Sequence, residues 1–130
     1  MTAMIEYPIE PGTPVSHLPF SPATRVGEFV FVSGQASVDP TGKYVADTFE
    51  GEVRRSIENL KKVLETAGSD LAHVVMTRNY VRNASDVAEF NRIYPEYFKA
   101  PYPARTTITN CLGTLLYEID CTAVVKGAKG

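Results

Sequence analysis

Cysteine and histidine are scarce in this chain of 130 residues, which contains two of each. Cys111 and Cys121 form neither a CxxC redox pair nor the spacing of a zinc site. His17 and His73 are far apart in the sequence, so no metal-binding cluster is expected. A chain of this length buries about two thirds of its unfolded surface as one domain. We therefore expect a single domain over residues 1–130 that needs neither disulfides nor a structural metal.

Positive charge is not in excess either. The chain has 13 Lys and Arg against 15 Asp and Glu, a formal charge of -2. Affinity for nucleic acids comes mainly from Lys and Arg that neutralise phosphates, and the sequence has no basic stripe. Residues 1–6 lack the features of a signal peptide, and no apolar run is long enough to span a membrane. We expect no nucleic-acid partner, no membrane association and a cytoplasmic location.

The first part of the chain is rich in proline, which disfavours a long helix before position 45. A short edge strand is expected near residues 4–7. Residues 23–26 and 29–33 are strand-like and flank a glycine, which predicts a hairpin. The second run is apolar on both faces, which is typical of a central strand covered on both sides. It ends at Ser33 and Gly34, where a small residue and a glycine allow the backbone to approach another chain or a ligand closely. The alternative and more common reason for such a glycine is a turn.

Helical periodicity begins near Asp47, with Asp47 as the expected cap and Gly68 as the expected stop. Its charged residues, including Glu52, are expected outside the apolar stripe. A strand over 74–81 and a second helix ending near Phe98 follow. The residues of that helix expected to face the core, at helical spacing, are Val87, Phe90, Ile93, Tyr94 and Tyr97. Asn91, near its middle, is expected to be exposed.

The last two segments, 101–110 and 116–125, are predicted strands. In the second, Tyr117, Ile119 and Cys121 alternate with Glu118 and Asp120, so one face is apolar and the other polar. If the two segments pair as an antiparallel hairpin, Arg105, Thr107 and Glu118 share the polar face. An arginine and a carboxylate there can bind an anionic substrate and direct a water. The alternative interpretation is a solvated surface ion pair.

These elements together predict an α+β fold, a mixed sheet with two helices packed on one face. The opposite face then carries polar side chains beside the apolar residues of 29–32. A half-apolar sheet face without helices must be covered, and self-association is the usual way.

The order and spacing of several short motifs resemble the RidA/YjgF family of reactive intermediate deaminases, which is also called endoribonuclease L-PSP. The resemblance covers about 18–125. The motifs are Phe29-Val-Phe-Val-Ser-Gly-Gln35, Ile57-Glu-Asn59-Leu60, Phe90-Asn91 followed by Tyr94 and Phe98, Pro103-Ala-Arg105, and Tyr117-Glu118-Ile119.

The resemblance implies a chorismate-mutase-like fold and a homotrimer with its sites between subunits. It also implies an enzyme that uses no cofactor. Its expected substrates are 2-imino acids or enamines such as 2-iminobutanoate and 2-iminopropanoate, which it hydrolyses to 2-keto acids and ammonia. The alternatives are a non-catalytic trimer that binds small carboxylates or acts as a chaperone, and an endoribonuclease, which the acidic composition disfavours.

By the same resemblance, Arg105 matches the arginine that holds the substrate carboxylate, and Glu118 matches the acid near the attacking water. Ser33 and Gly34 match the pocket lining, and Asn91 matches a polar residue of the cleft. Thr107 stands where many members have cysteine, which excludes thiol chemistry there. Phe20 stands where tyrosine is frequent, which makes the expected cleft more apolar, and the connection from Thr109 to Leu116 is about two residues shorter than in typical members. These three departures together leave the exact substrate open and are compatible with a larger or more apolar imine or enamine acid.

Overall fold

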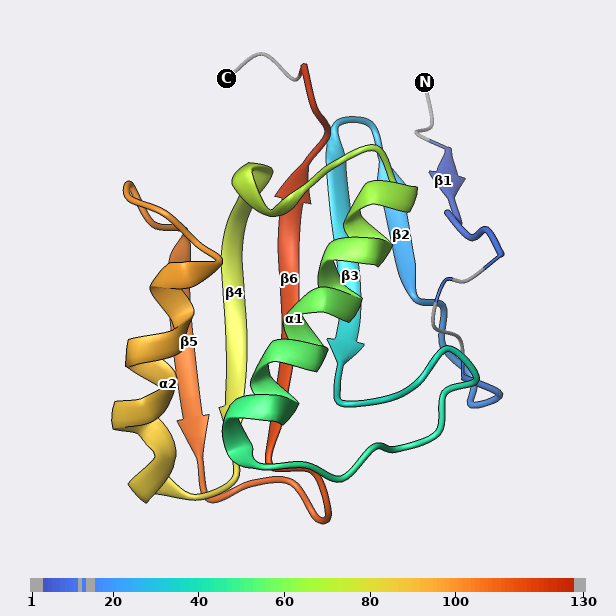
Figure 1. Cartoon of the computed structure of the whole chain (residues 1–130). Coiled ribbons are helices and arrows are strands. Elements are labelled where there is room, and N and C mark those ends of the chain that lie inside the picture. The colour runs from blue at the N-terminus through green and yellow to red at the C-terminus, as the bar shows by residue number, and fades with distance from the viewer. Residues whose placement is uncertain (1–3, 12, 14–15, 128–130) are drawn as a thin grey trace.

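The computed structural model describes residues 4–11, 13 and 16–127 and contains one six-stranded sheet and two α-helices (Figure 1). Three short 3-10 turns, at Leu71–His73, Ala84–Asp86 and Tyr94–Glu96, lie between these elements. The elements are β1 (Ile5–Glu6), β2 (Ala23–Val26), β3 (Phe29–Gln35), α1 (Phe49–Thr66), β4 (Val74–Val81), α2 (Val87–Ile93), β5 (Ala104–Thr109) and β6 (Tyr117–Val124).

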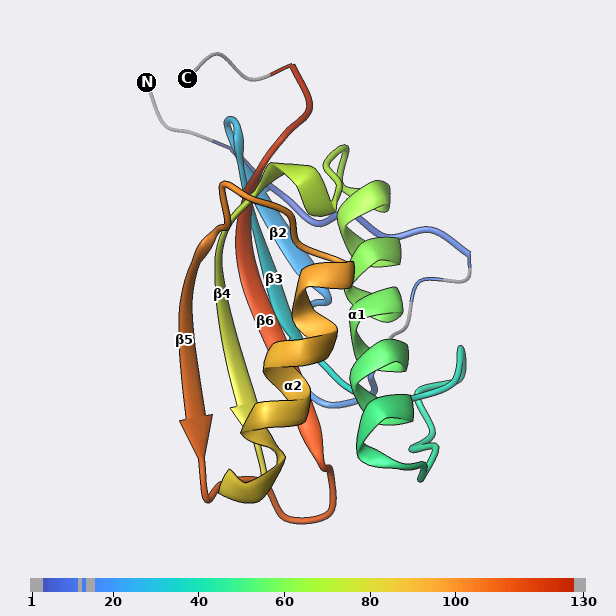
Figure 2. The ribbon, with the colours of Figure 1, turned by 60° about the vertical axis from the view of Figure 1, so that its left-hand side comes forward.

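The strands are ordered β1-β2-β3-β6-β4-β5, and β4 and β5 are the one parallel pair of neighbours among the described strands. Both helices cover the same face of the sheet (Figure 2). This arrangement confirms the predicted α+β class. The predicted hairpin is β2 and β3, with Gly27 in the turn at a φ of 59°, a value that glycine adopts without strain.

Helix α1 begins after Thr48, whose side chain accepts a hydrogen bond of 3.1 Å from the Gly51 backbone N–H. The prediction that Asp47 is the cap was wrong. Asp47 instead forms an ion pair with Arg55 at 3.2 Å. The predicted stop is confirmed, because Gly68 has a φ of 86° directly after the helix.

Glu52 corrects a second expectation about α1, because it is fully buried. Its carboxylate accepts hydrogen bonds from the Tyr44 hydroxyl and from the Leu116 backbone N–H at 3.1 Å. The apolar stripe of α1 is thus interrupted by a charged group that contacts two loops. Burial of this carboxylate is possible because both of its oxygens accept hydrogen bonds.

The second helix is shorter than predicted, since α2 ends at Ile93 and a 3-10 turn follows. Pro95 explains the change, because it has no N–H with which to continue the helical hydrogen bonds. The buried residues Phe90, Ile93 and Tyr94 nevertheless lie where the spacing placed them.

The core lies between the sheet and the two helices, and the other face of the sheet is open in this chain. On that open face, Phe29 and Phe31 of β3 are 51% and 45% exposed. The prediction that β3 is covered on both sides therefore does not hold within one chain. Because large apolar side chains are left on it, the open face is suited to contact another protein surface.

The two C-terminal strands, β5 and β6, do not pair with each other, so the antiparallel hairpin considered for residues 101–110 and 116–125 does not form. β4 lies between them, parallel to β5 and antiparallel to β6. Helix α2 returns the chain to the same end of the sheet after β4, as a parallel neighbour requires, and β6 then pairs with the other edge of β4. Both Arg105 and Cys121 pair with Thr77 and so lie on the helix-covered face. Glu118 pairs with Tyr80 and lies on the open face.

Candidate active site

Arg105 lies near the start of β5, just after Pro103. Its guanidinium carbon is 5.0 Å from the ring centre of Phe90 and 5.1 Å from that of Tyr94. A cation over an aromatic face is attracted by the ring quadrupole. Among the described residues, no side chain or carbonyl accepts a hydrogen bond from this guanidinium. Its face is therefore held by aromatic rings while its N–H groups remain free for a ligand.

A cavity of about 300 Å³ opens beside Arg105. Asn91, Tyr94, Pro95, Tyr102 and Pro103 form the rest of its lining. Arg105 is the one charged residue of this lining, and the remainder is aromatic or apolar apart from the Asn91 amide. Asn91 is exposed, as its place on the helix predicted, and it is also beside Arg105. Such a cavity suits a small molecule that has one carboxylate.

Glu118 is half-buried on the open face, close to Gly34 of β3. A β-carbon added to Gly34 would lie 2.7 Å from a carboxylate oxygen of Glu118, so the position admits only glycine without displacing the acid. Burial raises the pKa of Glu118, and the nearby negative charge of Asp120 raises it further. A carboxyl group with a raised pKa is a stronger base and can both accept and return a proton during a reaction.

A cavity of about 370 Å³ beside Glu118 is lined by four of the predicted residues together, Phe20, Ser33, Gly34 and Glu118 itself. Phe20 is 50% exposed, with its ring available to a ligand. The Ser33 hydroxyl already donates a hydrogen bond of 2.6 Å to the Ser21 carbonyl. Ser33 therefore supports the wall of the cavity.

Thr107 belongs to neither cavity lining. It pairs with Asn79 and so lies on the helix-covered face with Arg105. Its hydroxyl oxygen is buried and has no hydrogen-bond partner among the described residues. Apart from Thr107, the predicted site residues form two groups on opposite faces, Asn91 with Arg105 and Phe20 with Ser33, Gly34 and Glu118.

Two features of the site were missed in the sequence. Phe90 and Tyr94 were interpreted as core residues only, although their spacing of four placed both rings on one side of the helix. Asp120 was placed on the polar face with Glu118, but no role was assigned to it. In the structure its two oxygens accept hydrogen bonds from Arg78 at 2.8 Å and from the Tyr80 hydroxyl at 2.9 Å.

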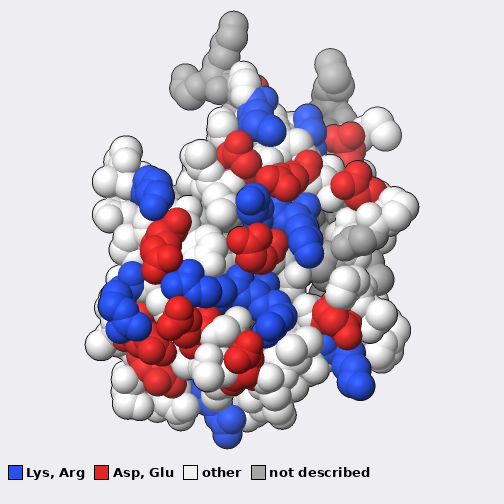
Figure 3. Space-filling view, viewed as in Figure 1, with Lys and Arg blue, Asp and Glu red and all other residues white. Residues whose placement is uncertain are grey.

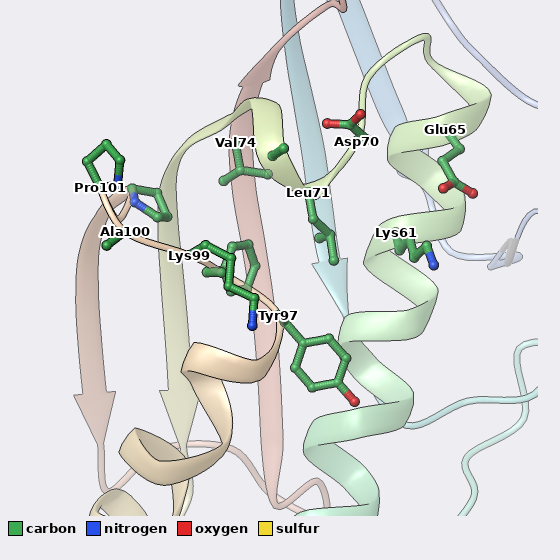
Figure 4. A pocket seen from close by; sticks show the side chains of 12 residues that line it. Lys61, Glu65, Asp70, Leu71, Val74, Tyr97, Lys99, Ala100 and Pro101 are labelled. Carbon is green, nitrogen blue, oxygen red and sulfur yellow. The ribbon is translucent and has the colours of Figure 1, made fainter.

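A further cavity, of about 480 Å³, shares Pro103 with the lining of the Arg105 cavity but contains none of the predicted site residues (Figure 4). Lys61 of α1 lines one side of it, and Tyr97 and Lys99 line the other. Its charged groups are partly engaged already, since the Lys99 ammonium donates to the Pro95 carbonyl at 2.8 Å. Acidic and basic side chains are interspersed over this face of the molecule (Figure 3).

The family model described as endoribonuclease L-PSP matches residues 12–125. The chain belongs to this family, that of RidA and YjgF. Among curated RidA/YjgF relatives, a RutC family protein of Pyrococcus abyssi is 42% identical over 91 residues, 69% of this chain and 72% of that protein. A 2-iminobutanoate/2-iminopropanoate deaminase of Dermatophagoides farinae is 33% identical over 91 residues, 69% of this chain and 71% of that protein.

Solved structures of the RidA/YjgF family have the same fold. The E. coli YjgF gene product superimposes with a TM-score of 0.82 at 29% identity, covering 92% of this chain and 98% of that one. E. coli TdcF with bound serine gives a TM-score of 0.81 at 28% identity, with coverage of 92% and 98%. The described residues include no helix with the length and apolar character needed to cross a membrane.

Proposed function

We propose that this chain hydrolyses reactive 2-imino acids and their enamine tautomers to 2-keto acids and ammonia. The observation that carries the proposal is the Arg105 guanidinium, which has aromatic rings on its face and N–H groups free beside a cavity. A guanidinium in this setting binds a carboxylate through two parallel hydrogen bonds. The deaminase named among its relatives supports the same chemistry.

Glu118 supplies the proton transfers in this proposal. The carboxylate removes a proton from a water, whose oxygen bonds to the imine carbon as the C=N π electrons move to nitrogen. Glu118 returns this proton to the nitrogen, which gives the neutral carbinolamine. Glu118 then removes the carbinolamine hydroxyl proton as the C=O bond forms and the C–N bond breaks, and it passes that proton to the leaving nitrogen, which departs as ammonia. Water is the sole co-reactant. Imines are reactive, so orientation and modest acid-base assistance are sufficient.

The two groups meet, in this proposal, at an interface between copies of the chain. Arg105 and Glu118 lie on opposite faces of one sheet, so a single copy does not present both to one substrate. A homotrimer would place the Arg105 cavity of one copy against the Glu118 cavity of the next and would cover the apolar open face. The bound serine of TdcF supports a site for a small molecule with a carboxylate.

An imine-hydrolysis assay tests the proposal. Threonine dehydratase generates 2-iminobutanoate continuously, and the protein is expected to accelerate formation of 2-ketobutanoate. Arg105→Ala is expected to abolish the acceleration, because the substrate is then no longer oriented. Arg92→Ala is the matched control, since Arg92 is exposed on α2 and, within the described part of the chain, forms an ion pair with Glu89 alone. No acceleration with several imino acids, small and bulky, would contradict the proposal.

The same Arg105 cavity also supports a second candidate function, carboxylate binding without turnover. That function predicts that 2-ketobutanoate raises the melting temperature in a manner that depends on Arg105, while imine loss stays at the uncatalysed rate. Measuring thermal shift and ammonia release on the same preparations separates the two functions.

A further inference from the structure

Tyr94 is the aromatic residue shared by the Arg105 cavity and the protein core. Its ring lies 5.1 Å from the Arg105 guanidinium carbon and stacks on Phe98 with ring centres 4.6 Å apart. Tyr94 is only 3% exposed, although it lines the cavity. The guanidinium therefore rests on a ring that is itself held by buried structure.

A chain of buried hydrogen bonds fixes that ring to the sheet. The Tyr94 hydroxyl lies 2.8 Å from the Thr77 hydroxyl, which also accepts a bond of 3.0 Å from the Asn79 amide. The Asn79 carbonyl oxygen in turn accepts a hydrogen bond from the Tyr117 hydroxyl. Thr77, Asn79 and Tyr117 are completely buried. A buried polar network with its members paired is rigid, because each lost bond leaves an unpaired polar group.

The Asn79 amide gives its two N–H groups to Thr77 and to the Thr106 carbonyl. Thr77 is thus an acceptor toward Asn79, and in its bond with the Tyr94 hydroxyl either oxygen can be the donor. Removing the Tyr94 oxygen would leave the buried Thr77 hydroxyl without this partner, whereas the ring would keep its place beside Arg105.

We propose that Tyr94 is a positioning residue for Arg105, which holds the guanidinium so that its free N–H edge faces the cavity. This inference rests on the proposed function for its kinetic consequence, but the geometry does not depend on turnover. Arg105 binds the carboxylate both in the enzyme–substrate complex and in the transition state. A less fixed guanidinium is therefore expected to raise KM more than it lowers kcat.

The test compares Tyr94→Leu, which removes the ring, with Tyr94→Phe, which removes only the hydroxyl. For imine hydrolysis, Tyr94→Leu is expected to raise KM about fivefold to tenfold, the range of a cation–π contact, with a smaller change in kcat. Tyr94→Phe is expected to melt at a lower temperature but to keep KM near that of the native chain. Tyr97→Leu is the control, because the Tyr97 ring lies over Arg54 instead, at 5.9 Å.

A second readout does not require catalysis. The Arg105 Nε–H signal in an NMR spectrum reports how freely the guanidinium moves, and Arg105→Lys assigns it. We expect the Arg105 guanidinium to be more mobile in Tyr94→Leu than in the native chain, and unchanged in Tyr97→Leu. A folded Tyr94→Leu with unchanged mobility and unchanged KM would overturn the positioning role. If the native chain hydrolyses no imine, the proposed function fails, and the NMR comparison alone decides whether Tyr94 positions Arg105.

Discussion

Arg105 and Glu118 lie on opposite faces of the same sheet, on strands that β4 separates. The arginine faces α2 and rests on its aromatic residues. The acid lies over Gly34 on the face that no helix covers. If both act on one substrate, they must come from different copies, and each copy then contributes to two sites.

This arrangement predicts that two inactive variants restore activity when they are mixed. Arg105→Ala and Glu118→Gln are each expected to be inactive in imine hydrolysis. After they are unfolded and refolded together in equal amounts, about a quarter of the native activity is expected, because each site draws its two groups from two chains at random.

The control is each variant refolded alone, followed by the two mixed only after refolding and kept at low temperature. Neither sample should recover activity unless subunits exchange. If the co-refolded mixture is as inactive as its components, while the oligomers have formed, the site does not combine these two residues across an interface.

Much of this fold was predictable because its signals are local. The alternation through Tyr117, Glu118 and Ile119 and the spacing of apolar residues along α1 reflect the geometry of single elements. The partner of β5 was not predictable from such signals, because pairing depends on where α2 returns the chain. Glu52 was misplaced for a related reason, since its partners lie outside the helix, Tyr44 in the segment before it and Leu116 in a loop 64 residues farther along the chain.

Gly34→Ala is predicted to displace the acid without unfolding the protein. The added β-carbon would lie 2.7 Å from a Glu118 oxygen, and a flexible side chain gives way more easily than backbone. We expect kcat/KM to fall about tenfold or more, since small displacements of a reacting group are costly. Gly113→Ala is the matched control, because nothing lies within 4 Å of its β-carbon position. Equal activity in the two variants would show that the position of Glu118 is unimportant.

The pH dependence of activity should report the environment of Glu118. Its pKa lies above the ordinary value of 4.5, because of burial first and of Asp120 second. Since the carboxylate form accepts the proton from water, activity is expected to rise with pH, with a midpoint above that value. Asp120→Asn removes the neighbouring negative charge and should move the midpoint of kcat/KM to lower pH. A midpoint that is unchanged or higher would contradict this assignment.

The same group should make stability depend on pH. With its pKa raised, Glu118 in the folded chain binds more protons than in the unfolded chain between the ordinary and the raised value. The free energy of unfolding therefore falls as pH rises through that window. Glu118→Gln is expected to reduce this decline, as measured by urea unfolding at a series of pH values. If the free energy of unfolding declines identically with pH in the variant, titratable groups other than Glu118 cause the decline.

The open face should be the surface through which copies associate. Phe29 and Phe31 have ring centres 6.5 Å apart and are half exposed there. Phe31→Asp is expected to convert the proposed trimer into a monomer and to abolish imine hydrolysis, because a charge on this face opposes its burial. Light scattering measures the mass. Ile9→Asp is the control, since Ile9 is 61% exposed and precedes Glu10, which contacts Thr66 of α1.

Glu52→Ala is predicted to destabilise the fold although it removes no apolar contact. The buried carboxylate accepts hydrogen bonds from the Tyr44 hydroxyl and the Leu116 N–H, and both donors would lose this partner. We expect the free energy of unfolding to fall by about 1.5–3 kcal/mol, the range for hydrogen bonds to a charged group. Glu58→Ala, which changes an exposed residue of the same helix, should shift it by less than about 0.5 kcal/mol.

Glu52→Gln separates the charge of this group from its shape. The amide keeps one acceptor oxygen but presents an NH₂ group to the other donor, so we expect a loss smaller than that of the alanine variant. Because Leu116 directly precedes β6, which carries Glu118, the alanine variant should also lower kcat in imine hydrolysis under conditions where it remains folded. Urea unfolding curves that coincide for Glu52→Ala and Glu58→Ala would show that the buried carboxylate contributes no net stability. A folded Glu52→Ala with native kcat would show that its bond to Leu116 does not help to place Glu118.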